Sequence, residues 1–422
     1  MANDGLVVGL DIGTTKVCAI IGERAESGKV EITGVGTSPC AGLRKGVVVN
    51  IEATLRSVVA AVEAAERMSG QNVQSCWTGI GGSHIDGLNS RGVVAVSGKN
   101  RETREISGDD VRRVLEAARA VVIPMDRQVL EVIPQSFIVD NQKGIRDPLD
   151  MIGVRLEAEV HIITCSVTSA GNLIKCVNRA GFRVNDLILQ SLAAGRATLT
   201  EEEKELGVAL IDLGGGTTEV MVYSQGTPYS TTTIAVGGVQ VTSDISMVKN
   251  IAFGTSEDIK LRAGCCWESL LEDEDDDILA QGVGGRAIAI PRYQLLEIIR
   301  PRMEEIFCMV KERLDRLSLF RPLGGGIVLT GGGAQLLGAA ELASAVFQLP
   351  VRIGVPFAMG GLVDEYRSPV YATAVGLILE GTGRDQPQVE RPGIIEAPER
   401  NQTPFFKQII AKVTDYWKKE LF

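Results

Sequence analysis

The chain twice repeats an apolar run, a glycine-rich turn and a second apolar run. Residues 6–22 read LVVGLDIGTTKVCAIIG, and residues 207–223 read GVALIDLGGGTTEVMVY. Each copy places an aspartate at the end of the first run, then the turn, two threonines and a β-branched return run. This pattern predicts two β-hairpins. Because the copies start near residues 6 and 207, we predict a duplicated chain with two similar α/β lobes and not a solenoid.

Helical periodicity follows each predicted hairpin. Apolar residues recur at spacings of three and four from Ile51 to Ser69 and from Tyr293 to Leu317, which predicts two long amphipathic helices. The stretch from about 85 to 162 alternates strand-like and helix-like pattern and is long enough to form a small inserted domain. Within it, Ser107-Gly108-Asp109-Asp110 opens a helix that runs to about Val121, with Asp109 as its expected cap.

The apolar pattern of the core ends near Gly381, and the next residues have no periodicity. Residues 383–404 carry four prolines and mixed charges, which predicts a flexible linker. No apolar run approaches the 18 or so residues that span a bilayer, and Met1-Ala2-Asn3-Asp4 does not open a secretory signal.

The last residues, 405–422, read FFKQIIAKVTDYWKKELF and predict a short amphipathic helix. At about 100° per residue, one arc of roughly 120° is apolar, and it comprises Phe406, Ile409, Ile410, Val413, Trp417 and Leu421. The other side carries lysines that can meet anionic headgroups, namely Lys407, Lys412, Lys418 and Lys419. We interpret the segment as a helix that lies in the membrane interface. The alternative is a terminal helix folded back on the core.

Composition narrows the class of protein. The 422 residues are 45% hydrophobic and 23% charged, as in a globular protein of two or more domains. A net charge of -10 argues against nucleic acid as a partner. The eight cysteines show no CxxC pairing, and we interpret them as free, buried thiols of a reducing cytoplasm.

The two repeated turns have the chemistry of a phosphate site. Glycine lets backbone N–H groups approach anionic oxygens, hydroxyls add hydrogen bonds, and a lysine adds charge. The candidates are Gly13, Thr14, Thr15 and Lys16 in the first turn and Gly214, Gly215, Gly216 and Thr217 in the second. A carboxylate beside each turn suits a magnesium ion that keeps several waters and bridges phosphates, so we expect Asp11 and Asp212 to face Mg²⁺ from opposite lobes. One such turn alone would more often be structural.

A third glycine-rich turn follows the apolar strand expected at 326–329. It comprises Gly331, Gly332, Gly333 and Ala334 and leads toward a helix expected from Gln335. Such a turn can hold the adenine and ribose of a nucleotide. The P-loop, GxGxxG, GxSxG and HExxH patterns do not occur, and the only histidines, His84 and His161, are expected to be structural.

These three turns, in this order, resemble the nucleotide-binding signature of the actin superfamily. Within it, the chain is similar to the FtsA family of bacterial cell-division proteins, and the resemblance covers essentially all of it. The stretch Leu130–Thr164 resembles the end of the inserted subdomain that this family calls 1C. The resemblance implies a two-lobed actin-like α/β fold with an inserted α+β subdomain. Its expected parts are 1–84, 85–162 (1C), 163–206, 207–381 (with an outer subdomain, 2B, at about 244–322), 382–404 (linker) and 405–422 (membrane helix).

The resemblance also assigns roles near the nucleotide, which would be ATP with Mg²⁺. Gln190, after the strand expected at Asp186–Leu189, falls where the superfamily keeps the residue that orients the attacking water, and Asp11 and Asp212 are the expected catalytic carboxylates. Gly237, Glu257 and Lys260 fall at nucleotide-contacting positions. These residues would suffice for ATP hydrolysis, and they would equally serve a protein that binds ATP only to change conformation. The chain departs from the family where Glu131 replaces a common histidine and at residues 150–153, and it is shortened at 246–255.

The resemblance further implies a scaffold at the division septum, peripheral to the cytoplasmic face of the inner membrane. Its expected partners are the C-terminal tail of the tubulin-like protein FtsZ, further copies of the chain in actin-like filaments, later division proteins and the anionic membrane surface. Arg300, Arg302 and Glu305, on the helix expected at 293–317, are the candidates for the tail contact. Pilus assembly proteins of the PilM kind, chaperone ATPases and sugar kinases are the rival classes.

Overall fold

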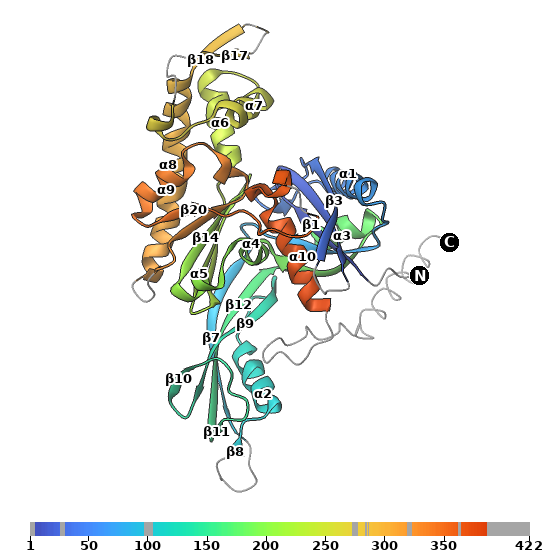
Figure 1. Cartoon of the computed structure of the whole chain (residues 1–422), viewed down its shortest axis with the longest axis vertical. Helices are drawn as coiled ribbons and strands as arrows, with labels where there is room; N and C mark the ends of the chain where they lie inside the picture. Colours follow the sequence, from blue (N-terminus) through green and yellow to red (C-terminus); the bar gives the residue numbers. More distant parts are fainter. Residues whose placement is uncertain are drawn as a thin grey trace, which may run out of the picture.

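The molecule consists of two lobes built on five-stranded sheets and a third body built on a four-stranded sheet (Figure 1). Its computed structural model describes residues 5–25, 30–96, 104–271, 277–282, 285, 287–318, 323–361 and 364–385.

The first sheet has the strand order β13-β6-β1-β2-β3 and is covered by helices on both faces. Its strands are β1 (Leu6–Ile12), β2 (Lys16–Arg24), β3 (Val30–Pro39), β6 (Ser75–Ile80) and β13 (Arg183–Leu189). The main helices around it are α1 (Ile51–Ser69), α3 (Val167–Arg179), α4 (Gln190–Thr198) and α10 (Ala372–Asp385). Because both faces are covered, β1 and β2 are buried almost throughout. The hairpin and the helix predicted at Ile51–Ser69 are confirmed.

The second sheet has the order β16-β15-β14-β19-β20. Its strands are β14 (Val208–Leu213), β15 (Thr218–Ser224), β16 (Thr227–Ile234), β19 (Ile327–Thr330) and β20 (Val351–Ile353). Helices α5 (Glu201–Leu206), α6 (Gly238–Lys249), α7 (Phe253–Ala263), α8 (Arg292–Ser318) and α9 (Ala339–Phe347), with the hairpin β17 (Asp277–Gln281) and β18 (Ala287–Pro291), complete this lobe. The helix predicted at Tyr293–Leu317 is α8, anchored by the fully buried Phe307.

The two sheets share one topology, which confirms the predicted duplication. In each, a central strand pairs antiparallel with the return strand of its hairpin, and that strand pairs antiparallel with the next. On its other side, the central strand pairs parallel with a strand that pairs parallel with the outermost one. The central strands β1 and β14 therefore end at equivalent places, and each carries an aspartate there.

The inserted body lies at one end of the molecule (Figure 1). Its sheet, of order β10-β9-β12-β7, is backed by one helix, α2. The elements are β7 (Asp86–Ala95), β8 (Arg104–Glu105), α2 (Gly108–Arg119), β9 (Arg127–Val139), β10 (Gln142–Ile145), β11 (Ile152–Gly153) and β12 (Arg155–Ser166). These bounds agree with the insertion expected at about 85–162.

The cap of α2 differs from the prediction. Ser107, and not Asp109, precedes the helix, and its hydroxyl accepts from the Asp110 N–H while the Asp110 carboxylate accepts from the Ser107 N–H at 3.0 Å. Asp110 is buried and pairs with Arg104 and Arg113. These cations compensate for its burial.

A seam of side chains joins the inserted body to β16 of the second lobe. The Asn89 amide donates to the Tyr229 carbonyl at 3.1 Å, and the Gln135 amide donates to the Pro228 carbonyl at 2.9 Å. The buried His161 lies between Asn89 Oδ1, at 2.7 Å, and Thr231 Oγ1, at 2.9 Å. Burial lowers the pKa of His161 to about 4, so its ring is neutral at physiological pH. A structural role for this histidine agrees with these contacts.

The last described helix, α10, carries the chain four residues past the expected end of the core at Gly381. Thr382 is buried, and the Arg384 guanidinium pairs with Glu131 at 2.7 Å and with Asp186 at 2.8 Å. The family's histidine is thus replaced here by a carboxylate that has its own cationic partner. The rest of the expected linker and the whole expected helix at 405–422 lie outside the described residues. None of the helices that the structure describes is long and apolar enough to cross a bilayer.

The cysteines are free thiols, as expected, and seven of the eight are buried. Cys308 is exposed, contrary to the prediction. It lies on α8, whose buried side is formed by residues such as Phe307 and Val310, so its position faces solvent.

The close crossing of α10 and α4 generates a stability prediction. A Cβ added at Gly376 would lie 1.8 Å from the Ala193 carbonyl oxygen, whereas one at Gly383, on the same helix, meets nothing within 4 Å. We expect Gly376→Ala to lower the free energy of unfolding by about 2–4 kcal/mol, because the two helices must separate. Gly383→Ala should leave it unchanged or raise it by up to about 1 kcal/mol. Urea unfolding of both variants measures the difference, and equal midpoints would contradict the crossing.

Candidate nucleotide-binding cleft

The two repeated turns meet face to face. Each closes with the same hydrogen bond, from Gly13 N–H to the Lys16 carbonyl at 2.8 Å and from Gly214 N–H to the Thr217 carbonyl at 3.0 Å.

Glycine is required where the turns touch. A Cβ on Gly215 would lie 2.6 Å from Thr15 Cγ2, and one on Gly216 would lie 2.6 Å from Thr14 Oγ1. The structure therefore brings together the eight residues that the sequence predicted from the two turns, with the threonines of one turn against the glycines of the other.

Asp11 and Asp212 end the central strands of the two sheets and are close enough to influence each other. Burial raises the pKa of Asp11, although the Lys16 charge and the Gln190 amide oppose this. Burial and then the Asp11 charge raise the pKa of Asp212 to about 6. The Thr373 hydroxyl donates to Asp212 Oδ2 at 3.2 Å. Asp11 is buried and Asp212 is partly buried, and two neighbouring carboxylates of this kind favour a cation between them.

Gln190, expected from the resemblance to orient a water, lies beside the first aspartate. It is the first residue of α4, directly after β13, and its Nε2 donates to Asp11 Oδ1 at 2.7 Å. The bond fixes the amide so that its carbonyl oxygen points away from Asp11. A Cβ on Gly81 would lie 2.0 Å from this oxygen, so the Gly81–Gly82 turn after β6 passes directly beside it.

Glu219 is a polar residue of the cleft that the sequence reasoning missed. It is the second residue of β15, it is 4% exposed, and its Oε1 accepts from the Gly82 N–H at 2.9 Å. The same hypothetical Cβ on Gly81 would lie 2.1 Å from this Oε1, so Glu219 faces Gln190 from the opposite lobe. Its Oε2 is buried without a hydrogen-bond partner among the described residues. Burial and the Asp212 charge raise the pKa of Glu219 to about 8, so it holds a proton at neutral pH.

One feature of the sequence could have indicated that Glu219 belongs to the site, namely its position one residue after the second threonine of the repeat. The first copy has Lys16 there, so the two copies carry opposite charges at this position.

Lys16 is placed differently from the expectation. Its Nζ donates to the Val370 carbonyl at 2.9 Å and lies 4.5 Å from the centre of the Tyr371 ring. Its charge still acts on both aspartates, since it lowers their pKa values against the effect of burial. A direct contact with a phosphate requires the side chain to leave this carbonyl.

The third turn packs directly on the second. Gly331 has φ of +80°, and a Cβ there would lie 2.2 Å from Asp212 Oδ1, whereas Gly333 packs on Leu213. Around Gly332 there is open space, and Ala334 is buried. The helix expected from Gln335 begins instead at Ala339, because residues Gly332–Gln335 form a 3₁₀ turn.

The residues expected near the nucleoside form one connected group. The Lys260 ammonium donates to Glu257 at 2.8 Å, to Thr242 at 2.9 Å and to the Gly238 carbonyl at 3.2 Å. Gly237 precedes α6 and packs on the Gly214 carbonyl, where a Cβ would lie 2.5 Å from the oxygen. The group thus joins α6 and α7 to the second turn.

These residues fit a nucleotide with a magnesium ion. Gly215 and Gly216 place no Cβ against the threonines of the first turn, Gly332 faces open space, and Glu219 Oε2 lacks a hydrogen-bond partner in the described part of the chain. No group of three or more metal-ligating side chains occurs among the described residues. An ion bound mainly through waters and phosphates needs fewer protein ligands than that.

The candidates for the FtsZ contact differ in whether their side chains are already held in ion pairs within the chain. Arg302 is held by Asp244, with its Nε 2.6 Å from Oδ2, and by Glu305. Arg300 lies over the Trp267 ring, 5.7 Å from its centre, and lines a pocket of about 570 Å³ between α8 and the 3₁₀ turn Glu268–Leu270. The membrane candidates at 406–421 lie outside the described residues.

Comparison with known proteins agrees with this geometry. Residues 82–164 match the family description "SHS2 domain inserted in FTSA", and residues 209–376 match "Cell division protein FtsA". The cell division protein FtsA of Pseudomonas aeruginosa is 45% identical over 377 residues, which is 89% of either chain.

Solved structures support the fold. The PilM-PilN type IV pilus biogenesis complex has a TM-score of 0.64 at 16% identity, covering 89% of this chain and 98% of the other. MreB5 of Spiroplasma citri bound to ADP has 0.51 at 15% identity, covering 91% and 97%. At these identities the likeness concerns the actin-like fold alone, which confirms the predicted architecture. The family is shown by the sequence matches over both lobes and the insertion, and the chain belongs to the FtsA family of cell division proteins.

Proposed function

We propose that this chain binds ATP with Mg²⁺ between its lobes and tethers FtsZ filaments to the cytoplasmic face of the membrane at the division septum. The observation that carries the proposal is the meeting of the duplicated turns, with the buried Asp11 and the partly buried Asp212 beside them, in a chain of the FtsA family. MreB5, which has the same fold, was solved with ADP.

The turns and aspartates would hold the phosphates and the ion. The backbone N–H groups and hydroxyls of residues 13–15 and 214–217 lie on both sides of the contact, so phosphates between them would be bound by both lobes. Bound Mg²⁺ would supply positive charge to the phosphate oxygens. Asp11 and Asp212 would orient its waters, and the group around Lys260 and the turn at 331–334 would contact the nucleoside.

Gln190 and Glu219 would act on a water in the cleft. The Gln190 carbonyl oxygen and the Glu219 carboxyl face one another across Gly81, one from each lobe, so a change in lobe contact changes their separation. The neutral Glu219 carboxyl can donate a hydrogen bond, and once ionised it can accept a proton. Binding alone suffices to make the lobe contact depend on the nucleotide.

Arg300 is the better placed of the arginines for an FtsZ tail. It lines the pocket between α8 and Glu268–Leu270, which also has an apolar part at Leu271 and Leu296. A tail with acidic and apolar character would meet both. Arg302 and Glu305 would support α8 through their ion pair and the pair with Asp244.

The segment 405–422 would attach the protein to anionic lipid, through the apolar arc and the lysines named above. Self-association into actin-like filaments would align many such segments, and their combined binding exceeds that of one. Recruitment of later division proteins would follow from the same scaffold.

Asp212 tests the nucleotide site. We expect Asp212→Asn to weaken ATP binding in the presence of Mg²⁺ by at least about tenfold, because one carboxylate facing the ion is lost. The variant should also lose most of the difference between binding with Mg²⁺ and with a chelator. Calorimetric titration measures both. Asp109→Asn, on α2, is the matched control, and a similar loss in the control or no loss at Asp212 would overturn the placement.

Glu219 predicts a pH dependence of stability without nucleotide. Its pKa is about 8 in the fold against an ordinary 4.5, so the folded state favours the protonated form, and this stabilisation is lost as pH rises from about 4.5 to 8. Glu219→Gln cannot ionise. Its free energy of unfolding, relative to that of the wild type, should therefore rise by about 2–4 kcal/mol across this window. Urea unfolding at several pH values, with the exposed-site control Glu63→Gln, checks this. Parallel curves for Glu219→Gln and wild type would contradict it.

Tethering is tested by sedimenting anionic vesicles with the protein, ATP and a labelled FtsZ tail peptide. The full chain should carry the peptide into the pellet. Deletion of residues 402–422 should abolish sedimentation but keep peptide binding in solution, because the two sites are separate. Arg300→Glu should weaken peptide binding by at least about tenfold and keep sedimentation. Arg316→Glu, an exposed position on the same helix, is the control for the charge reversal. Sedimentation by the deleted chain would refute the membrane helix.

A further inference from the structure

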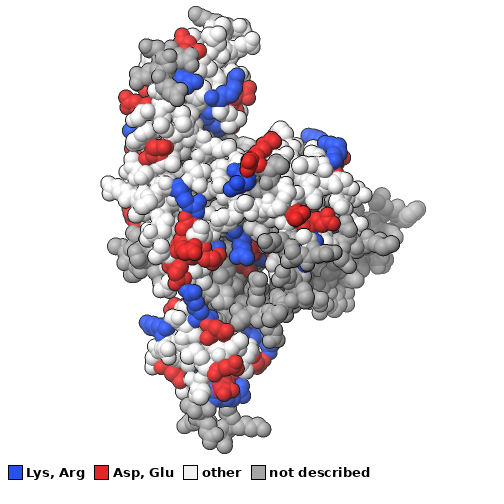
Figure 2. Space-filling view, viewed as in Figure 1, with Lys and Arg blue, Asp and Glu red and all other residues white. Residues whose placement is uncertain are grey.

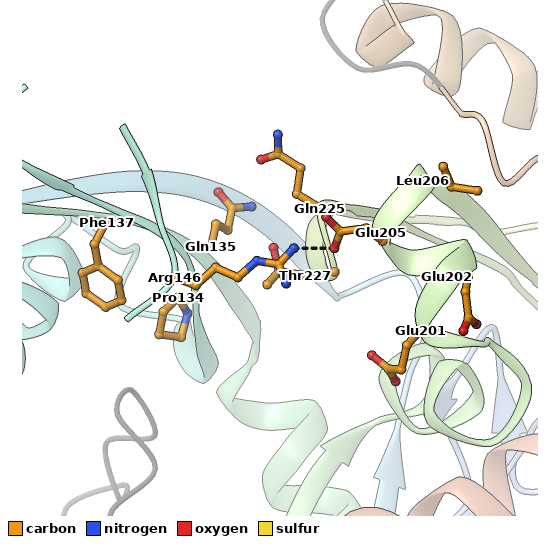
Figure 3. Close-up of a pocket in the computed structure, with 11 residues that line it drawn as sticks. Pro134, Gln135, Phe137, Arg146, Glu201, Glu202, Glu205, Leu206, Gln225 and Thr227 are labelled. Carbon is orange, nitrogen blue, oxygen red and sulfur yellow. Dashed lines mark hydrogen bonds and ion pairs between the residues drawn. The ribbon is translucent and has the colours of Figure 1, made fainter. Parts of the chain in front are cut away.

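A pocket of about 780 Å³ lies between the inserted body and the second lobe, and no residue of the nucleotide turns lines it (Figure 3). One wall comes from β9 and the segment after β10, and the other comes from α5 and the β15–β16 turn. Figure 3 shows Arg146 reaching across from the inserted body to Glu205, with which it forms an ion pair. The pocket thus lies at a junction whose walls belong to different bodies.

The pocket is apolar and acidic. Pro134, Phe137 and Leu206 contribute to its lining, and Leu206 is 63% exposed, which is unusual for leucine. The first residues of α5, Glu201 and Glu202, are exposed at its edge. A group of acidic side chains is visible in Figure 2 at the level where α5 lies in Figure 1. An occupant with large apolar side chains and positive charges would match both features.

The chain itself ends its described part close to this pocket. Arg384 is the second-to-last residue of α10, and it forms an ion pair with Glu131 on β9. Pro134, which lines the pocket, follows Glu131 on the same strand at a distance of about 10 Å. Residues 386–404 then precede the segment 405–422. The linker that the sequence predicts there would have an average span of about 24 Å, so the segment would reach the pocket at high effective concentration.

The composition of that segment matches the pocket. Its apolar arc includes Trp417 and Leu421, and its lysines include Lys412 and Lys418. The pocket volume is that of a small-molecule site, so it would admit a few large side chains and not the helix itself.

We propose that, away from a membrane, the segment 405–422 docks on this pocket, with apolar side chains against Pro134 and Leu206 and lysines toward Glu201 and Glu202. The inference rests on the proposed membrane role of the same segment. Lipid and the pocket then compete for the same apolar arc. When the segment binds a membrane, it leaves the pocket, and the inserted body and the second lobe are no longer bridged by it. Conversely, an occupied pocket lowers the apparent affinity for lipid.

A test without lipid uses hydrogen exchange of the full chain. We expect Trp417→Asp to raise exchange at α5 and the β15–β16 turn by about tenfold relative to wild type, because the docked segment leaves. Exchange at α1, remote from the pocket, should not change. Unchanged exchange at α5 would overturn the docking whatever the segment does with lipid.

A second test uses anionic vesicles and a pocket variant of the full chain. Leu206→Asp adds negative charge, which by itself weakens binding to anionic lipid. If the pocket holds the segment, the variant should instead bind vesicles about three- to tenfold more tightly. Leu261→Asp, on α7 and 69% exposed, is the matched control and should bind no more tightly than wild type. Weaker or equal binding by Leu206→Asp would overturn the inference.

The two tests separate the two hypotheses. If the exchange test succeeds but the wild-type chain does not sediment with vesicles, the proposed membrane function fails and the docking stands. If the wild-type chain sediments but neither variant behaves as expected, the docking fails and the membrane function stands.

Discussion

The contact between two copies of one turn constrains everything else in this protein. Thr14 and Thr15 press on Gly216 and Gly215, and beside this contact the buried Asp11 and the partly buried Asp212 lie near each other. Burial and mutual repulsion both oppose their ionisation, so the bare cleft stores unfavourable electrostatic free energy that a cation relieves. The packing of the two turns therefore makes the contact between the lobes sensitive to a charged ligand. A single hairpin could not produce this, because the second carboxylate comes from the other copy.

Much of the architecture could be predicted from the sequence because it follows from local pattern. The repeated hairpin fixes two central strands, and the shared topology of the sheets follows from the repeat. Helix periodicity located α1 and α8 within a residue. The errors came where a side chain has two plausible roles. Ser107 and Asp109 both suit a cap, and the reciprocal hydrogen bonds between Ser107 and Asp110 decide between them.

Parts of the site were beyond sequence reasoning for a different reason. Glu219 looks like an ordinary polar residue in a strand, and its role depends on the Gly81–Gly82 turn, far away in sequence. Likewise, nothing in the pattern of α8 distinguishes Arg302, which Asp244 holds, from Arg300, which lies over Trp267. Such assignments need the folded structure, because the residue that each side chain contacts lies on another helix, strand or turn. Gln190 was named through the family resemblance, and its hydrogen bond to Asp11 could be found only in the folded structure.

The seam at β16 has a consequence for the behaviour of many copies in one place. Both β7 and β16 are outer strands of their sheets, and outer strands readily pair with those of other molecules. Here the amides of Asn89 and Gln135 occupy backbone carbonyls of β16, so that edge is already engaged by side chains. If many copies of the protein are close together, this engagement of the β16 edge disfavours intermolecular pairing of edge strands, and association through other, specific interfaces is left open.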